Sequence, residues 1–509
     1  MTEKRFNLVD EPWIPVADYG LVSLRQVFLN PQLRAIGGTP LEKIAIMKLL
    51  LAIAQAACTP DDNAAWQALG VGGITKACLA YLDKWHEAFW LYGERPFLQM
   101  PAVAKAKRLP YGALLPHVAS GNATYLFQTQ LGPEMTDAQK AMLVLVNMAC
   151  CFSGKKVDTS TALSPGVTKS ASAEAGPALC SQGLLHSFLQ GATLLQTLWY
   201  NLLTTQDVAS IKTFTSGVGR PPWEAMPQGE ACPLAEGLRH SLMGRLVPLA
   251  RFLLLQEDGV CVVEGLRHPN YLHGSVADPS AAIQFNEKRN KALWANPSRR
   301  PWRSLASMLA FVDSNPAMTK QIYVCLHLQK GLPKLYAAQA GAFGLWCGGI
   351  KLSSNAGEQY LTGQDDVVES EFTLSTDYVG GEHSLWFSAW QRNMGRLEAL
   401  GAALWGAVHN YYKAQKEDRA QDYAQNACQI FWQLAERCAE ELSTACAQEA
   451  PAAAEAVMGR MVGSAATAYD TACPQDTARQ LQLWARWRPR FDEKPAAVRT
   501  AEGANHGKQ

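Results

Sequence analysis

Residues 6–16 read Phe-Asn-Leu-Val-Asp-Glu-Pro-Trp-Ile-Pro-Val. The stretch sets Trp13 between Pro12 and Pro15, and each proline restricts its own backbone and that of the residue before it. We therefore expect an extended segment that buries one large side chain. Such a segment anchors a fold but carries no chemistry, so the function must be sought elsewhere in the chain.

Length and charge set the first bounds on the protein. The chain has 509 residues, with 46 Lys and Arg against 45 Asp and Glu, and so a formal net charge of +1. A single core seldom grows past ~250 to 300 residues, so we expect at least two domains. Because the net charge is near zero, any binding of nucleic acid must come from local basic patches.

Cysteine usage and hydropathy indicate the compartment. The thirteen Cys are scattered from Cys58 to Cys473, without a Cys-x-x-Cys pair. Such spacing is typical of reduced thiols in a cytoplasmic protein, and we expect no signal peptide. The longest apolar run, residues 44–57, is interrupted by Lys48 and Gln55, which is too short and too polar for a membrane span. We predict no membrane association, no cofactor and no metal.

Local signals predict helices and strands in the first three quarters of the chain. Thr39-Pro40-Leu41-Glu42 is a capping box with Pro at the first helical position, and it predicts a helix that runs to residue 57. Further helices are predicted at residues 63–90, 137–152 and 184–203. Strands are predicted at residues 244–255 and 259–263, with further β structure at residues 321–328 and 372–379.

The last quarter is Ala-rich and has the pattern of a helical bundle. Three- and four-residue steps mark one helix face at Trp386, Trp390, Met394, Leu397, Gly401, Leu404 and Val408. Three more helices are predicted at residues 420–447, 453–471 and 477–487. The predicted fold class is therefore α+β: a large mixed domain over residues 1–380, an all-α four-helix bundle over residues 381–491, and a disordered tail over residues 492–509.

Motifs for catalysis are missing from the sequence. His268 and His273 lie five residues apart, no carboxylate is nearer than Glu264 and Asp278, and two His alone do not hold a catalytic metal. Neither a Gly-x-Ser-x-Gly elbow nor a Walker loop occurs. These absences favour a protein that is not an enzyme. Two alternatives stay open: a metal-dependent nuclease that uses these histidines, and a protein-only helical interaction scaffold.

One stretch, residues 284–303, is strongly basic. It combines one anion with six cations, a local charge of +5, and it also holds two Trp: Glu287, Lys288, Arg289, Lys291, Arg299, Arg300, Arg303, Trp294 and Trp302. Cations interleaved with aromatic rings suit phosphate contact and groove entry. A solvated charged face is the competing interpretation.

Further motifs make a pattern when they are taken in order. They are residues 94–99 (Glu-Arg-Pro-Phe-Leu-Gln), 120–127 (Ser-Gly-Asn-Ala-Thr-Tyr-Leu-Phe), 187–191 (Ser-Phe-Leu-Gln-Gly), 219–224 (Gly-Arg-Pro-Pro-Trp-Glu) and 348–351 (Gly-Gly-Ile-Lys). With residues 6–16 and the strand at 244–255, their order and spacing resemble the CasA family, the large subunits of the type I-E CRISPR surveillance complex Cascade. The resemblance runs over roughly residues 6–487.

The resemblance implies a role in antiviral defence. It implies a subunit without enzymatic activity that recognises a protospacer-adjacent motif (PAM) in double-stranded DNA, opens the duplex beside it to start an R-loop, and helps recruit a helicase-nuclease. The implied partners are crRNA, double-stranded target DNA, the backbone, small and handle-binding subunits of Cascade, and the CRISPR helicase-nuclease.

The resemblance also implies site residues by position. A PAM-proximal loop corresponds to Gly166, Val167, Thr168 and Lys169, although only Gly166 and Gly176 are glycines within residues 164–176. A lysine finger corresponds to Lys288, Arg289 and Lys291, with Lys288 foremost. A wedge corresponds to Ser353, Ser354 and Asn355, with Asn355 parting the first base pair. A loop that docks on the crRNA handle and the backbone subunit corresponds to Phe127, Gln128 and Thr129. Only Cys261 stands where some members carry clustered Cys, so no zinc is expected.

Overall fold

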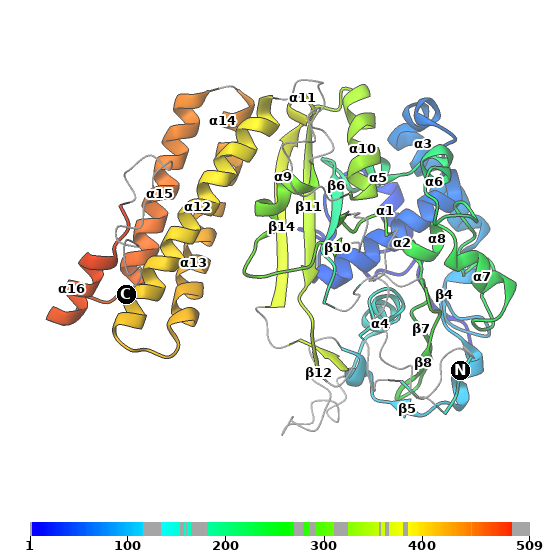
Figure 1. Cartoon of the computed structure of the whole chain (residues 1–509). Coiled ribbons are helices and arrows are strands. Elements are labelled where there is room, and N and C mark those ends of the chain that lie inside the picture. The colour runs from blue at the N-terminus through cyan, green and yellow to red at the C-terminus, as the bar shows by residue number, and fades with distance from the viewer. Residues whose placement is uncertain are drawn as a thin grey trace. The chain divides into compact units, whose positions relative to one another are not determined.

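The chain folds as two compact units. The computed structural model describes residues 3–115, 134–152, 157–158, 160–163, 179, 182–268, 278–284, 291–309, 324–355, 358–361, 366–379, 385–448 and 450–490. The first unit contains the described residues up to Pro301, resumes after residue 306 and continues to residue 379. The second contains Trp302–Ala306 and the described residues from 385 onward (Figure 1). A mixed unit followed by a helical one confirms the predicted fold class.

Short strands and helices alternate along the first three quarters of the chain. The strands are β1 (Arg5–Asn7), β2 (Ile14–Val16), β3 (Gly20–Val22), β4 (Trp90–Tyr92), β5 (Arg108–Leu109), β6 (His186–Gln190), β7 (Arg251–Gln256), β8 (Gly259–Glu264), β9 (Ile283–Gln284), β10 (Lys291–Ala292), β11 (Ala342–Ile350), β12 (Ser353–Asn355), β13 (Glu358–Tyr360) and β14 (Val367–Ser375). The helices are α1 (Leu24–Leu29), α2 (Pro40–Cys58), α3 (Asn63–Lys84), α4 (Asp137–Ala149), α5 (Leu194–Asn201), α6 (Thr205–Ala209), α7 (Pro233–Arg239), α8 (Met243–Leu246), α9 (Leu305–Met308), α10 (Leu326–Ala337) and α11 (Thr376–Val379). Single 3₁₀ turns are η1 (His86–Phe89), η2 (Pro101–Lys105), η3 (Tyr111–Leu114) and η5 (Pro301–Ser304).

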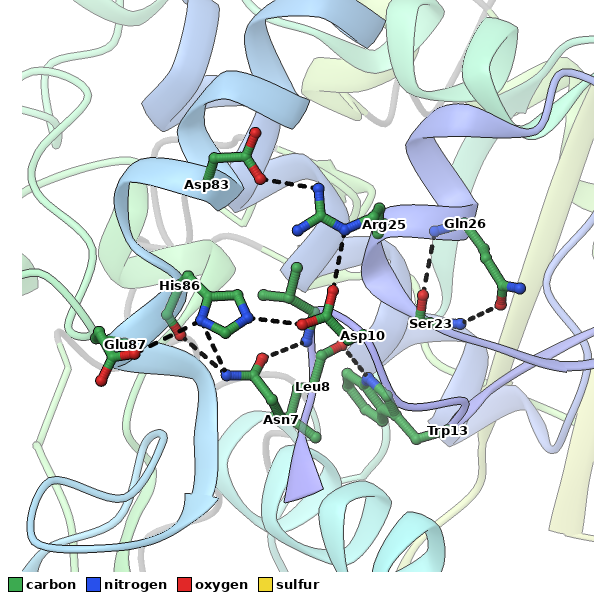
Figure 2. Close-up of polar contacts among 11 residues, drawn as sticks. Asn7, Leu8, Asp10, Trp13, Ser23, Arg25, Gln26, Asp83, His86 and Glu87 are labelled. Atoms are coloured by element: carbon green, nitrogen blue, oxygen red, sulfur yellow. Dashed lines mark hydrogen bonds and ion pairs between the residues drawn. The ribbon is translucent and has the colours of Figure 1, made fainter. Parts of the chain in front are cut away.

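The N-terminal stretch is the anchor that the sequence predicts. Trp13 is 1% exposed, and its indole Nε1 donates a hydrogen bond to the Leu8 carbonyl oxygen at 3.0 Å (Figure 2). Strand β1 pairs with β4, and β2 pairs with β3, both antiparallel. The predicted burial of one large side chain is therefore confirmed. The stretch is not extended throughout, because Asp10 and Glu11 donate their N–H groups to the Asn7 carbonyl oxygen and residues 8–10 form a turn.

Partly exposed ion pairs join this anchor to α1 and to the end of α3 (Figure 2). Arg25 of α1 places Nε 3.0 Å from Asp10 Oδ1 and a terminal nitrogen 2.8 Å from Asp83 Oδ1. His86 Nε2 lies 2.6 Å from the other oxygen of Asp10. Burial acts to raise the pKa of Asp10, but the hydrogen bonds with His86 and Arg25 outweigh it and lower the pKa. Exposed pairs of this kind contribute little energy each, so their main effect is orientation.

Helix α2 begins where the sequence predicts. Glu42 Oε2 accepts a hydrogen bond from Thr39 N at 2.7 Å, and Glu42 N donates to Thr39 Oγ1 at 3.4 Å, which completes the capping box. The helix predicted at residues 63–90 ends earlier than expected. Helix α3 stops at Lys84, and the chain turns through η1 into β4, because the backbone of β4 is paired with β1.

The helix predicted at residues 184–203 is wrong in its first half. Residues His186–Gln190 form strand β6, and helix α5 begins only after Thr193, whose side chain accepts a hydrogen bond from Gln196 N. Strand β6 pairs with β11 over five positions. Pairing with a distant strand overrides the local apolar pattern, which alone does not separate a buried strand from a buried helix.

Three further predictions need correction. Strand β7 begins at Arg251, where its pairing with β8 begins, and the residues predicted as its start include helix α8. Of residues 321–328, Val324 bridges to Ile283, but α10 starts at Leu326. Strand β14 ends at Ser375, and α11 follows it.

The long sheet of the first unit has the order β14-β11-β6. Strand β11 pairs antiparallel with β14 along all nine residues, from Ala342 opposite Ser375 to Ile350 opposite Val367. Helix α2 packs against β11 and β14. Buried and exposed positions alternate along β14, as they do in a strand with one face turned to a core. A smaller sheet has the order β5-β8-β7.

The second unit is helical. Its helices are α12 (Leu385–Ala414), α13 (Ala420–Glu436), α14 (Ala439–Ala447), α15 (Pro451–Ala472) and α16 (Ala478–Trp487). All seven residues of the predicted α12 face are buried. A Cβ on Gly401 would lie 2.9 Å from the Trp432 ring, so α12 and α13 approach closely there. The segment predicted as one helix at residues 420–447 is broken between α13 and α14.

Replacing Trp13 by Ala should destabilise the first unit by ~3–5 kcal/mol, because it leaves a large cavity and removes the indole hydrogen bond to the Leu8 carbonyl oxygen. Urea-dependent hydrogen exchange, read from peptides of β1 and β4, measures the change. The matched control is Trp405→Ala on α12, where the Trp is 39% exposed and a loss below ~1 kcal/mol is expected. Equal losses in the two variants would contradict the anchoring role.

Candidate nucleic-acid interface

The predicted lysine finger falls on the connection between β9 and β10. The two strands pair antiparallel, with Lys291 opposite Gln284. Lys291 therefore lies in β10, directly after residues 285–290. Lys288 and Arg289 belong to those residues, which lie outside the part of the chain that the structure describes. The structure thus defines the two strands, β9 and β10, between which residues 285–290 lie in sequence.

A small apolar cluster supports this strand pair. Leu184, Ala281 and Ile283 are each at most 2% exposed, and Ala292 and Trp294 pack against them. Trp294 is partly buried by this packing. Its predicted contact with a DNA groove stays a prediction.

The predicted wedge forms the first strand of the hairpin β12–β13. The paired positions are Ser353 with Tyr360, Ser354 with Gln359 and Asn355 with Glu358. The backbone of Asn355 is therefore the last paired position before the two-residue connection. The hairpin follows β11 in sequence, and Figure 1 shows it beyond the ends of β11 and β14. An element at the end of a long, fully paired ribbon has a stable base.

Residues 182–185, here called the junction segment, hold the base of this hairpin. Leu352, directly before β12, donates its backbone N–H to the Gln182 carbonyl oxygen at 3.0 Å. One residue earlier, the Lys351 N–H donates to the Asp366 carbonyl oxygen at 2.7 Å, at the start of β14. The two residues before the hairpin are therefore hydrogen-bonded to the junction segment and to the residue that precedes β14.

The same junction segment holds the end of β10. Leu185 donates its N–H to the Leu293 carbonyl oxygen at 2.9 Å, and Ala295 donates its N–H to the Gly183 carbonyl oxygen at 2.9 Å. The structure thus brings together the stems of the predicted finger and the predicted wedge. Sequence reasoning missed this segment because it assigned a helix there. The available signal was the pair of glycines, Gly183 and Gly191, that bracket the strand.

The remaining predicted residues lie beyond the described ranges. They are Gly166, Val167, Thr168 and Lys169 of the PAM-proximal loop and Phe127, Gln128 and Thr129 of the docking loop. The described residue Leu179 follows the first of these loops, and its carbonyl oxygen accepts the N–H groups of Gly183 and Leu184 at 3.0 and 3.1 Å. Leu179, which follows the predicted PAM-proximal loop in sequence, is therefore bonded to the junction segment.

The end of the basic stretch has a structural role that the sequence did not predict. Trp302 is fully buried in the second unit, with its ring 5.8 Å from that of Trp432. Arg303 pairs with Glu398 at 2.7 Å and lies 3.5 Å above the Trp432 ring. These two residues build the helical unit. The expectation that they contact phosphate and enter a groove is wrong, because burial and pairing already occupy them.

A buried ion pair positions the segment before β9. Lys48 of α2 and Asp278 are 1% and 2% exposed, and the Lys48 ammonium pairs directly with the Asp278 carboxylate. Lys48 Nζ also donates to the Arg245 carbonyl oxygen at 3.0 Å, and Ser280 donates its N–H and Oγ–H to Asp278 at 3.0 and 2.8 Å. Burial acts to raise the pKa of Asp278, but the charge and hydrogen bond of Lys48 hold it well below its usual range.

This polar cluster extends to β6 and α10. His186 Nδ1 lies 2.7 Å from Ser280 Oγ, and Ser187 donates its N–H to the Ser280 carbonyl oxygen at 2.7 Å. From α10, His327 donates its N–H to the Pro279 carbonyl oxygen at 2.9 Å. The segment that leads into β9 is therefore fixed by α2, β6 and α10 together.

The structure describes one member of the candidate histidine pair, His268. His268 Nε2 donates to the Pro248 carbonyl oxygen at 2.7 Å, and burial lowers the pKa of His268 to about 3. His273 lies outside the described residues. Within the described ranges, no group of three or more His, Cys, Asp or Glu is placed to hold a metal ion. His268 thus has a packing role.

Comparison with known proteins gives the family. A family model described as CRISPR-associated protein Cse1 matches residues 7–469. The chain therefore belongs to the Cse1 family of CRISPR-associated proteins, and the resemblance seen in the sequence is confirmed. CRISPR-associated protein CasA/Cse1 of Thermus thermophilus is 30% identical over 332 residues, which are 60% of this chain and 60% of that protein. The alignment thus spans about three fifths of that relative's length.

Solved structures share the fold. Thermobifida fusca Cse1 matches with a TM-score of 0.72 at 19% identity, over 95% of this chain and 97% of that one. A chain of a structure titled CRISPR RNA-guided surveillance complex matches with a TM-score of 0.59 at 19% identity, over 96% and 99% of the two chains. No helix in the described ranges has both the length and the apolar character needed to cross a bilayer.

Replacing Lys48 by Met should cost the first unit ~3–5 kcal/mol, because Asp278 is then a buried charge without its partner. The double variant Lys48→Met/Asp278→Asn should lose much less than the two single variants together. Hydrogen exchange of α2 peptides in urea measures both values. Lys84→Met, on an exposed residue of α3, is the control.

Acid provides a second readout of the same pair. The pKa of Asp278 is lower in the folded chain than its unfolded value of ~3.9. The carboxylate therefore contributes fully above about pH 5 and loses this contribution as the pH falls further. The double variant should lose less stability than the wild type on acidification. Parallel pH profiles would contradict the assignment.

Proposed function

We propose that this chain is the large subunit of a type I-E CRISPR RNA-guided surveillance complex. In this role it recognises the PAM in double-stranded DNA, helps to open the duplex and start the R-loop, and helps to recruit the helicase-nuclease. The chief support is the Cse1 family match over residues 7–469, together with stems for a basic loop and a hairpin that meet at the junction segment. No catalytic residue of its own is required.

The proposed roles follow the sequence positions. Lys288, Arg289 and Lys291 contact phosphates and the groove beside the PAM, and Gly166 to Lys169 approach it from a second loop. Asn355, with Ser353 and Ser354, parts the first base pair. Phe127, Gln128 and Thr129 dock on the crRNA handle and the backbone subunit. Other proposed partners are the small and handle-binding subunits and the helicase-nuclease.

The two structural units divide the proposed work. Residues 1–380 form the part that reads the PAM and docks on the complex, and residues 381–491 form a helical bundle that contacts other components. The support for this division is that both predicted DNA elements have their stems in the first unit.

The charge distribution suits a protein that scans DNA. A net charge of +1 limits non-specific attraction, while a few cations still release counterions when they contact phosphates. The family resemblance implies an approach from the minor-groove side, and the minor groove distinguishes A·T from G·C pairs poorly, so recognition should tolerate several PAM sequences. Once the first pair is open, guide pairing replaces DNA pairing at nearly balanced energy. The protein therefore has to lower only the cost of the first step.

Changing Lys288, Arg289 and Lys291 together to Ala should weaken binding of PAM-bearing DNA by the assembled complex and reduce the salt dependence, because up to three phosphate contacts are lost. Filter binding at several salt concentrations measures both effects. The charge-matched control is Lys76, Lys84 and Lys212 changed to Ala, which are exposed residues of the same unit. PAM-dependent affinity that stays at the wild-type value would contradict the assignment.

Changing Asn355 to Ala should slow R-loop formation more than it weakens initial binding, because the side chain acts only when the first pair opens. Stopped-flow fluorescence with a base analogue beside the PAM separates the two steps. Asn63→Ala, which removes the same side chain at an exposed position of α3 outside the proposed DNA elements, serves as the control. If Asn355→Ala affects both steps equally, the wedge role is not supported.

A further inference from the structure

Gly183 occupies a position that only glycine fits. Its φ is +89°, in the region that L side chains rarely adopt. A Cβ there would fall inside the contact radius of the Ile350 carbonyl oxygen and lie 3.5 Å from Leu352 N. The absence of a side chain therefore lets the junction segment approach the end of β11, just where the hairpin β12–β13 begins.

A second glycine, in β11, also allows the junction segment and β11 to approach closely. A Cβ on Gly349 of β11 would lie 2.5 Å from the Leu184 carbonyl oxygen and 3.1 Å from the Ala295 Cβ. The junction segment, the end of β11 and the residues after β10 thus meet with no room for one further methyl group. Close-packed contacts of this kind transmit displacement instead of absorbing it.

Backbone hydrogen bonds from the junction segment fix the distance between the base of the hairpin β12–β13 and the end of β10. The carbonyl of Gln182 holds Leu352, before the hairpin, and the carbonyl of Gly183 holds Ala295, after β10. These acceptors are adjacent in the chain, so a shift of Gly183 moves both stems together. Since the partners are backbone groups, no side-chain rearrangement can compensate.

We propose that Gly183 is a positioning residue that sets the spacing between the hairpin β12–β13 and strand β10, and through it the rate at which the first base pair beside the PAM opens. This inference rests on the proposed function of the two elements in opening DNA. Gly183 does not itself contact the nucleic acid in this scheme.

The test uses the complete complex with crRNA and its other subunits, carrying Gly183→Ala. A duplex with a fluorescent base analogue beside the PAM reports initial binding and opening separately. Opening should slow about tenfold, because displacement of a positioned group by an ångström commonly costs that much or more. Initial affinity and its salt dependence should stay at the wild-type values, since no phosphate contact is removed. A loss of folding alone would not produce this split.

Two further variants separate the causes. Gly341→Ala, at the other end of β11, has a φ of +73° and nothing within 4 Å of its Cβ, so it introduces backbone strain without the clash. It should open DNA at the wild-type rate. Gly349→Ala introduces a clash with the junction segment without a positive φ, and it should slow opening as Gly183→Ala does.

Each other outcome has a defined meaning. Wild-type opening by a folded Gly183→Ala complex would overturn the proposal, and so would equal slowing by Gly341→Ala. Loss of folding in both Gly183→Ala and Gly349→Ala, read by hydrogen exchange in α2 and β14, would show that these residues serve the fold and would also overturn it. Failure of the wild-type complex to open DNA in a PAM-dependent way would instead overturn the proposed function.

Discussion

The ion pair between Lys48 and Asp278 constrains the centre of the first unit. Both groups are buried, so their attraction must offset a large desolvation cost, and it can do so only in one close geometry with further hydrogen bonds. The segment that starts at Asp278 is thereby fixed against α2, and backbone bonds from β6 and α10 complete its position. Strand β9 continues this segment, so the stem of the basic connection has the same fixed origin.

Backbone contacts connect this fixed segment to the hairpin β12–β13. Strand β9 pairs with β10, and the residues after β10 bond to the junction segment, which in turn bonds to the base of β12. Two glycines allow the close approach. The wedge role proposed for the hairpin requires such a stem, because a flexible base would yield before the duplex did. The residues proposed to contact DNA can therefore lie at or near short connections, because the paired strands on either side of each connection are fixed.

Sequence patterns predicted those elements whose signals are local. The capping box at Thr39 located α2, and the buried face of α12 followed from its three- and four-residue steps. Strand β6 was misassigned because its partner β11 lies more than 150 residues later in the chain. Trp302 and Arg303 were assigned to DNA because their composition suited it, whereas their actual partners, Trp432 and Glu398, are about 100 residues or more away.

The sequence alone determined the family, the division into mixed and helical parts, and the local basic charge of the finger region, because motif order, periodicity and charge are properties of neighbouring residues. Only the tertiary structure decided that Arg303 of the basic stretch is taken up in packing, and which segments hold the hairpin and β10. It also showed that Gly183 lies between them. Those facts depend on pairing across long stretches of chain, where burial and backbone hydrogen bonding outweigh local preference.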